Sequence, residues 1–226
     1  MASDIFPNRN KPLPLLTTPA YATGKDDPFT IYASRITLSH NAFIRGFNSI
    51  NQHARNLKPS DHKDFIDYCI AWVTCFGEDH FREEIRLFSA LEEASGQRRI
   101  FDHVLDLHTI YHRDLQTLKN YLLTFEHFRN PATDFSPSHL LALNDKIALP
   151  LHAHLASVPP SILALSRFST PEHPFDPLAI DRAVELSDDK KTTTYIFNVL
   201  PVWLLNVESE QFENGRWKEW FAGIED

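Results

Sequence analysis

The sequence has few cysteines, no excess of positive charge and no long apolar run. Its only two cysteines among 226 residues are Cys69 and Cys75, too few for a disulfide framework, so we expect a reducing compartment and predict a cytoplasmic location. Lys and Arg number 22 against 30 Asp and Glu, a formal net charge of −8. A nucleic-acid partner is therefore not expected, because binding to a phosphate backbone requires a dense basic surface.

Other absences narrow the chemistry. The sequence contains no nucleophile elbow, no phosphate-binding loop and no Cys-x-x-Cys pair, so it gives no support to hydrolytic or nucleotide-dependent chemistry. No stretch approaches the roughly 20 uninterrupted apolar residues that cross a bilayer, so no membrane span is expected. Hydrophobic residues nevertheless make up 42% of the chain and charged residues 23%, which is the composition of an ordinary folded domain.

Apolar residues recur every three to four positions over four long stretches, and this spacing predicts amphipathic helices. We expect the helices at about residues 28–55, 60–94, 99–128 and 137–166. Short connections join them, and no stretch alternates as a strand would. The predicted fold is therefore all-α, with an antiparallel four-helix bundle over residues 30–168.

Two segments flank this predicted bundle. Residues 1–29 are rich in Pro, Thr, Asn and Gly, so we expect an extended lead-in. Residues 169–226 begin with a proline-rich loop and continue with predicted helices at about 178–186 and 192–207. Three of the four Trp residues lie after residue 200. We expect this C-terminal extension to pack against the bundle and to close one end.

The second and fourth predicted helices carry further local signals. On the second, we expect an inward apolar stripe formed by Phe65, Tyr68, Cys69, Trp72, Val73, Phe76, Phe81, Ile85 and Phe88. Gly96 should end that helix, because glycine readily takes the left-handed conformation of a helix C-terminus. Pro159 and Pro160 should kink or break the fourth helix.

The 12 histidines stand out by their spacing. Each predicted helix carries histidine where it should face the bundle interior, in the order His40, then His80 with Glu84, then His108 with His112, then His154. Residues four apart share one face of a helix. Imidazole nitrogens and carboxylate oxygens suit iron or zinc-like ions, and facing helices of a bundle can converge such ligands.

Each of these signals is weak when considered alone. Twelve histidines placed at random would give about 0.6 His-x-x-x-His pairs, so such a pair also fits two solvated surface histidines. A lone His40 or His154 is more often a hydrogen-bonded core residue than a ligand. The order of the residues on four separate predicted helices is what favours a metal site.

Four stretches of the sequence resemble the hemerythrin-like domains, in particular those of fungal proteins. They are LSHNAFIRGFNSI, DHFREEIRLFSALEEASG, DLHTIYHRDL and LHAHLASVPPSILAL. The resemblance covers about residues 28–168 in the same order. In the tail, LPVWLLNVESEQFENG is similar to the extension that such fungal proteins carry.

The resemblance implies a ligand set and a cofactor. In this family two non-haem iron ions lie in the bundle core, bridged by carboxylates and an oxo or hydroxo group, with one face open for dioxygen. Carried over residue by residue, the iron ligands would be His40, His80, Glu84, His108, His112 and His154.

The sequence departs from the family at one ligand. The fourth helix of the family carries a second carboxylate four or five residues after its histidine, but here those positions are Val158 and Pro159. The site could therefore hold two irons with a water or substrate group in the vacant place, hold a single metal ion, or have lost metal binding. Asp79 and Glu83 should turn away from the Glu84 face, so no substitute is evident.

These expectations lead to one functional hypothesis and two alternatives. We expect a non-haem iron protein that binds and activates dioxygen and oxidises a small organic molecule, because a missing carboxylate leaves an open coordination position. An iron- or oxygen-sensing or storage module is the first alternative, since metal binding and folding are linked. A degenerate bundle scaffold without metal is the second.

Overall fold

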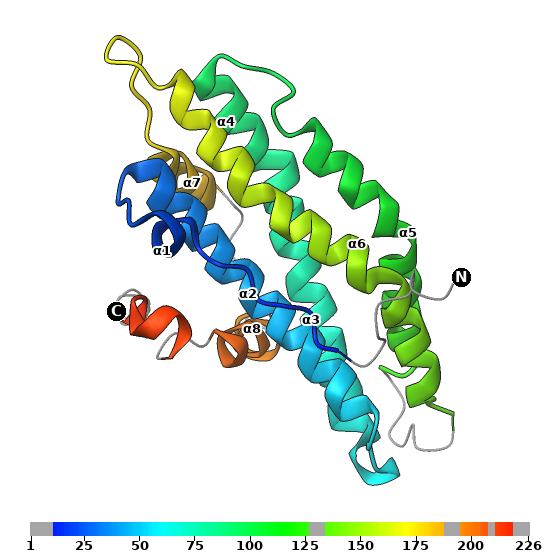
Figure 1. The fold of residues 1–226 in the computed structure, drawn as a ribbon. Helices are drawn as coiled ribbons and strands as arrows, with labels where there is room; N and C mark the ends of the chain where they lie inside the picture. The colour runs from blue at the N-terminus through cyan, green and yellow to red at the C-terminus, as the bar shows by residue number, and fades with distance from the viewer. Residues whose placement is uncertain (1–10, 127–133, 188–194, 208–210, 219–226) are drawn as a thin grey trace, which may run out of the picture.

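All regular structure in the described part of the chain is helical. The computed structural model describes residues 11–126, 134–187, 195–207 and 211–218, and no strand occurs among them. This confirms the predicted all-α class. Four long rods dominate the fold (Figure 1), and they are α2 (Pro28–Ala54), a second rod, α5 (Asp102–Leu123) and α6 (Pro137–Ala164). The second rod runs continuously through α3 (His62–Phe81), the π-helical turn η2 (Arg82–Leu87) and α4 (Phe88–Ser95).

The four rods form a closed ring of contacts. α2 packs against α3 and α6, and α5 packs against the same two helices. Successive rods run in opposite directions along the chain (Figure 1). Each rod therefore turns one face towards the other three, and side chains on that face meet in the interior.

Local chemistry explains where the rods begin and end. The Asp27 side chain accepts hydrogen bonds from the amides of Phe29 and Thr30, both at 3.1 Å, and Pro28 occupies the first turn of α2. These groups satisfy or remove amides that a helix start leaves unpaired. Gly96, with a φ of 65°, ends α4 as predicted.

The helix bounds follow the predictions with three differences. A short helix, α1 (Pro19–Thr23), lies inside the lead-in that was expected to be extended. The predicted break at Pro159 and Pro160 does not occur, because α6 continues through both prolines to Ala164. The third helix, α5, ends at Leu123 and not at about residue 128. Residues 1–10 of the lead-in, residues 127–128 and the predicted start of the last helix at 192–194 lie outside the described residues.

The C-terminal extension packs along the sides of the rods. Its helix α7 (Pro177–Ser187) contacts α2, α4 and η2. The π-helical turn η5 (Tyr195–Val199) leads into α8 (Leu200–Asn206), which contacts α2 and α3. Asn206 joins this helix to the second rod through a hydrogen bond from its side-chain amide to the Tyr68 hydroxyl at 2.9 Å.

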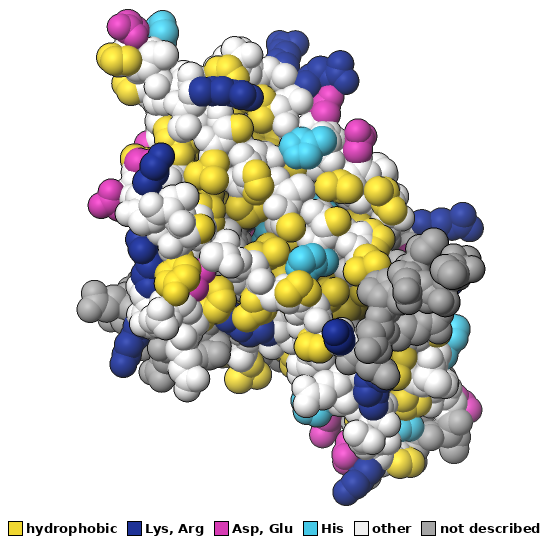
Figure 2. Space-filling model, viewed as in Figure 1, with side chains coloured by type: hydrophobic (Ala, Val, Ile, Leu, Met, Phe, Trp, Pro, Cys, Tyr) yellow, Lys and Arg dark blue, Asp and Glu magenta, His cyan; other side chains and the backbone are white. Residues whose placement is uncertain are grey.

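The helix α6 is the most apolar of the four rods. Together with the turn η4 (Leu165–Phe168) it is long and apolar enough to cross a membrane, a property that buried core helices share. Figure 2 shows hydrophobic side chains along the middle of the face over α6, with many of the charged side chains around its edge. Because α6 packs against both α2 and α5, we interpret it as a core helix.

Two clusters of buried apolar side chains fill the space between the rods, and each rod contributes to both. Along each rod, the buried apolar residues belong to one cluster up to a certain point and to the other cluster beyond it. The residues that flank this point are Ile36 and Phe43 on α2, Phe76 and Leu87 on the second rod, Val104 and Tyr111 on α5, and Leu155 and Val158 on α6. The interval between the clusters holds a set of histidines and carboxylates.

Candidate metal centre

A layer of polar side chains separates the two apolar clusters. We call it the polar layer, and its members are His40 on α2, Asp79, His80, Glu83 and Glu84 on the second rod, His108 on α5, and His154 on α6. Four of them are almost completely buried: His40 and His154 are 0% exposed, Glu83 is 1% and His80 is 3%. Burial of so many ionisable groups is costly unless they are paired or bind an ion.

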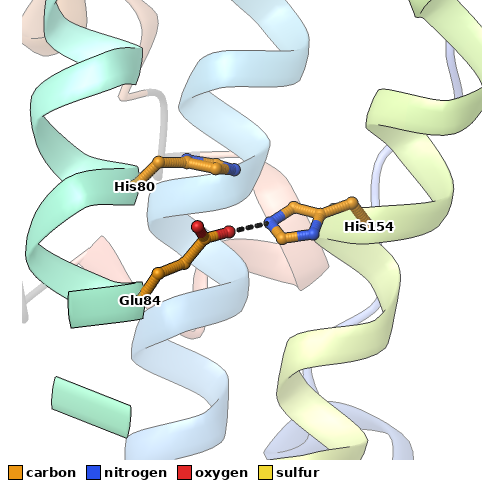
Figure 3. A group of neighbouring side chains, drawn as sticks. All are labelled: His80, Glu84 and His154. Carbon is orange, nitrogen blue, oxygen red and sulfur yellow. Dashed lines mark ion pairs between the residues drawn. The ribbon is translucent and has the colours of Figure 1, made fainter. Parts of the chain in front are cut away.

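His80, Glu84 and His154 form the first group of potential ligands. Each offers one nitrogen or oxygen atom, and these atoms lie within 4.8 Å of one another. In Figure 3, His80 and Glu84 project from the second rod towards His154 on α6. The Nε2 atom of His154 lies 3.8 Å from Oε1 of Glu84, too far for a hydrogen bond. Neither atom has a hydrogen-bond partner, although both are buried.

Neighbouring groups fix the orientation of these side chains. Nδ1 of His154 donates to the Val104 carbonyl at 3.1 Å, so its Nε2 carries a lone pair that faces the interior. Nδ1 of His108 donates to Oε2 of Glu84 at 2.6 Å, which leaves Oε1 of Glu84 free. Such outer contacts orient metal ligands in proteins. In this arrangement His108 supports Glu84.

The His80 ring is held by two aromatic residues. It packs on Phe76 with ring centroids 4.0 Å apart, and its Nε2 is hydrogen-bonded to the Tyr111 hydroxyl at 3.0 Å. Its centroid is 4.7 Å from that of His154. Burial raises the pKa of Tyr111, so the hydroxyl keeps its proton.

Burial also determines the protonation of the two histidines in the first group. It lowers the pKa of His80 well below its usual value, and the positive charges that His154 and His40 would carry lower it further. Burial lowers the pKa of His154 to about 4. Both imidazoles are therefore neutral at neutral pH, which is the form that binds a metal ion.

His40, Asp79 and Glu83 form a second group of potential ligands. Their ligand atoms also lie within 4.8 Å of one another. Nε2 of His40 is 3.5 Å from Oε1 of Glu83. Three atoms of this group are buried without a hydrogen-bond partner, namely Nε2 of His40, Oδ2 of Asp79 and Oε2 of Glu83.

Pro159 helps to orient His40. A proline has no amide hydrogen, so it cannot donate to the carbonyl four residues earlier in the helix. That carbonyl belongs to Leu155, and it accepts a hydrogen bond from Nδ1 of His40 at 2.9 Å. The proline in α6 thus leaves an acceptor that turns Nε2 of the imidazole towards Glu83.

The pKa values of the second group are shifted in different directions. Burial alone would lower the pKa of His40, but the Glu83 carboxylate beside it outweighs burial and the pKa is raised. Burial opposes the charge of Glu83 as well, yet His40 and Arg82 lower its pKa. Burial and the neighbouring Glu83 raise the pKa of Asp79 to about 7. The Glu83 carboxylate thus favours the protonated form of His40, and His40 favours the charged form of Glu83.

Five of the six predicted ligands lie in one of the two groups or directly beside one, and His112 does not. His80, Glu84 and His154 are brought together, and His108 adjoins them through Glu84. His40 lies in the neighbouring group. The structure does not bring His112 into either group, because Tyr111 takes the inward position on α5 and the next residue faces solvent. Nδ1 of His112 is 3.4 Å from Nε2 of His108, and its side chain is exposed. Ligation of a metal by these six residues stays a prediction.

Sequence reasoning missed Asp79 and Glu83 as members of the site. The expected inward stripe of the second helix also proved wrong at Phe81 and Ile85, which are 57% and 60% exposed. Continuing the spacing of three to four residues from Phe76 leads instead to His80, Glu83, Leu87 and Leu91, all of which are buried. That continued spacing was the signal that could have found Glu83.

Comparison with known proteins finds a distant relative that is named after a biosynthesis cluster. No protein-family model matches the sequence, and no solved structure matches it. A protein from Cryptosporiopsis sp. (strain 8999), named dimeric xanthone biosynthesis cluster protein R11, is 29% identical over 161 residues. The match covers 70% of this chain and 59% of the relative, so it spans less than two thirds of the relative's length.

Proposed function

We propose that this chain is a hemerythrin-like non-haem iron protein that binds and activates dioxygen and oxidises a small organic molecule. In this proposal the four rods are the hemerythrin-like four-helix bundle, and the polar layer holds the metal. The observation that carries the proposal is the set of buried, unpartnered nitrogen and oxygen atoms contributed by α2, the second rod and α6.

The energetics favour a bound cation. A buried polar atom without a partner costs about 1–3 kcal/mol. The two groups contain six such atoms: Nε2 of His40 and His154, Nδ1 of His80, Oε1 of Glu84, Oδ2 of Asp79 and Oε2 of Glu83. One or two cations in the polar layer would bind the ligand atoms that lie within 4.8 Å of one another in each group. A donor set of imidazoles and carboxylates suits iron or zinc, so the residues fit the implied metal.

The residues of the first group have distinct roles in this proposal. His80, Glu84 and His154 would hold the metal, while the Val104 carbonyl and His108 keep His154 and Glu84 in position. Bound iron would supply the redox chemistry and an open coordination position. Phe76 and the apolar clusters keep bulk water out.

A hydrogen-bond donor and a route to the surface adjoin the first group. The buried Tyr111 hydroxyl, 3.0 Å from Nε2 of His80, keeps its proton and can donate a hydrogen bond. His108 is partly exposed and leads to His112 at the surface. The α5 side is therefore where a small molecule such as dioxygen would approach.

The named relative bears on the choice between an enzyme and a sensor. Its name places it in a biosynthesis cluster, and a biosynthesis cluster makes a small organic compound. This favours an oxidative enzyme over an iron- or oxygen-sensing or storage module. The cytoplasmic location and the absence of a nucleic-acid partner stay predictions.

Metal analysis of the purified protein tests the proposal. The full chain, purified without chelator, should contain iron, and His154→Ala should lose iron from the first group. His152→Ala is the matched control, because His152 lies on the same helix but is only partly buried and contacts the Pro14 carbonyl instead of the polar layer. It should keep the iron content of the wild type. A wild-type protein that binds neither iron nor zinc would overturn the proposal and favour a scaffold.

A spectroscopic experiment tests the dioxygen step. The iron-loaded protein, reduced without air, should change its visible or near-ultraviolet absorption when dioxygen is added. The His154→Ala variant should show no such change, and a wild-type spectrum that is indifferent to dioxygen would contradict this part of the proposal.

A further inference from the structure

We infer that His40, Asp79 and Glu83 form a second position for a divalent cation such as ferrous iron, and that the second rod thereby supplies the carboxylates that the fourth rod lacks. The inference rests on the proposed function, because it adds a second metal position to the first. It assigns ligand roles to Asp79 and Glu83, which lie outside the predicted ligand set.

The geometry of the three side chains is that of an incomplete coordination shell. Each presents one buried atom without a hydrogen-bond partner, and Nε2 of His40 is held in place by the hydrogen bond from its Nδ1 to Leu155. The 3.5 Å between Nε2 of His40 and Oε1 of Glu83 is long for a hydrogen bond. Ligands of one metal ion at about 2.0–2.2 Å from it are commonly separated by such distances.

The second rod can serve two metal positions because it offers two ligand pairs. Asp79 and Glu83 are four residues apart, and so are His80 and Glu84. The pairs are offset by one residue and therefore turn to adjacent sides of the rod, one towards His40 on α2 and the other towards His154 on α6. Glu83 and Glu84 lie in the π-helical turn η2, a distortion that is frequent at functional sites.

The charges near the second group suit a divalent cation. Two carboxylates with one neutral imidazole balance a charge of two. Arg82 lies 3.9 Å from Oδ1 of Asp79, but its guanidinium also donates to Oδ1 of Asp181 on α7 at 2.5 Å. Asp181 thus offsets the charge of the arginine, while Oδ2 of Asp79 remains available to a metal ion.

The position of Val158 agrees with this replacement. Val158 is 0% exposed and belongs to the apolar cluster that also contains Leu87 and Val104. On the fourth rod, an apolar side chain therefore occupies the position at which the family resemblance leads one to expect a carboxylate. Glu83 supplies a buried carboxylate from the opposite side of the same layer.

Counting bound iron tests the inference. The full-length apoprotein would be loaded with ferrous iron without air, desalted, and assayed for iron per chain. We expect two irons in the wild type and one in Glu83→Gln, which keeps the size of the side chain. Asp79→Asn and His40→Gln should give the same loss. Glu78→Gln is the matched control, since Glu78 is an exposed carboxylate on the same helix, and it should keep two irons.

The outcomes separate the two proposals. Circular dichroism identifies variants that keep the helical fold, and at least one of the three substitutions should do so. If folded Glu83→Gln, Asp79→Asn and His40→Gln all keep the iron content of the wild type while His154→Ala loses iron, the second position is wrong and the proposed function stands. A wild-type protein without bound metal would overturn both.

Discussion

His154 should make the metal-free protein lose stability in mild acid. Burial lowers the pKa of its imidazole to about 4 in the folded chain, whereas an unfolded histidine titrates near 6.5. Between these two values the unfolded state binds a proton that the folded state does not. Stability therefore falls as the pH drops from about 6.5 to about 4.

The magnitude comes from the difference between the two pKa values. The full separation corresponds to about 3 kcal/mol, because each pKa unit is worth about 1.4 kcal/mol. Between pH 7 and pH 5 the loss from this residue is about 2 kcal/mol. His40 and His80 also titrate with shifted pKa values, so the effect of His154 must be isolated by comparing variants.

Urea unfolding of chelator-treated protein at pH 7 and pH 5, followed by circular dichroism, measures this loss. His154→Asn keeps a side-chain donor for the Val104 carbonyl but cannot titrate. Its free energy of unfolding should fall by about 2 kcal/mol less than that of the wild type between the two pH values. His152→Asn, a partly buried site on the same helix outside the polar layer, should behave as the wild type. An equal pH dependence in His154→Asn and the wild type would refute the reasoning.

Further substitutions test the packing of the rods. Gly46→Ala should lower the free energy of unfolding by about 1–3 kcal/mol, because a Cβ there would lie 2.5 Å from Cδ1 of Trp72. Gly77→Ala meets no atom within 4 Å and should instead stabilise its helix by about 0.5–1 kcal/mol; urea unfolding that gave both variants the same sign would contradict this contrast. Val158→Glu should cost more than about 2 kcal/mol in unfolding experiments and leave the iron content unchanged, because Glu83 already supplies a carboxylate. A rise in bound iron would show that the place at Val158 was vacant.

The sequence predicted most of the helices because their signals are local. Asp27 with Pro28, and Gly96, mark helix ends by their own hydrogen-bonding and conformational properties. The break considered at Pro159 and Pro160 does not occur, since a proline inside a helix removes a hydrogen bond but does not prevent the helix from continuing. Whether the helix continues depends on which donor reaches the freed carbonyl, and that donor, His40, lies on another rod.

The sequence predicts which candidate ligands lie at the same height along the bundle only for neighbouring rods that a short connection joins. For such a pair, the height of a residue follows from its distance to the connection. Measured from the connection between α2 (Pro28–Ala54) and α3 (His62–Phe81), His40 and His80 lie within about one helical turn of the same level. His108 and His154 match as closely when measured from the connection between α5 and α6. The connection between α4 and α5 allows no such inference. His108 lies near the start of α5, whereas the second rod continues far beyond His80 to Ser95.

The roles of Asp79 and Glu83 were harder to predict, because the expected apolar stripe leaves the buried face at Phe81 and Ile85. Hydrophobicity alone assigns Phe81 and Ile85 to the core. The regular spacing of the rod instead puts His80 and Glu83 inside, where hydrophobicity would exclude them. A polar residue at a position that helical spacing assigns to the core marks either an error in the assignment or a site, and here it marks a candidate site.

A metal ion bound as proposed would link metal binding to folding. The two groups of potential ligands come from three rods, so unfolding would release the ion, and the free energy of binding would add to stability. The second position also involves the C-terminal extension, because Asp181 on α7 pairs with Arg82 beside Asp79. A change in α7 should therefore affect the second position before the first, although none of its residues belongs to either group of ligands.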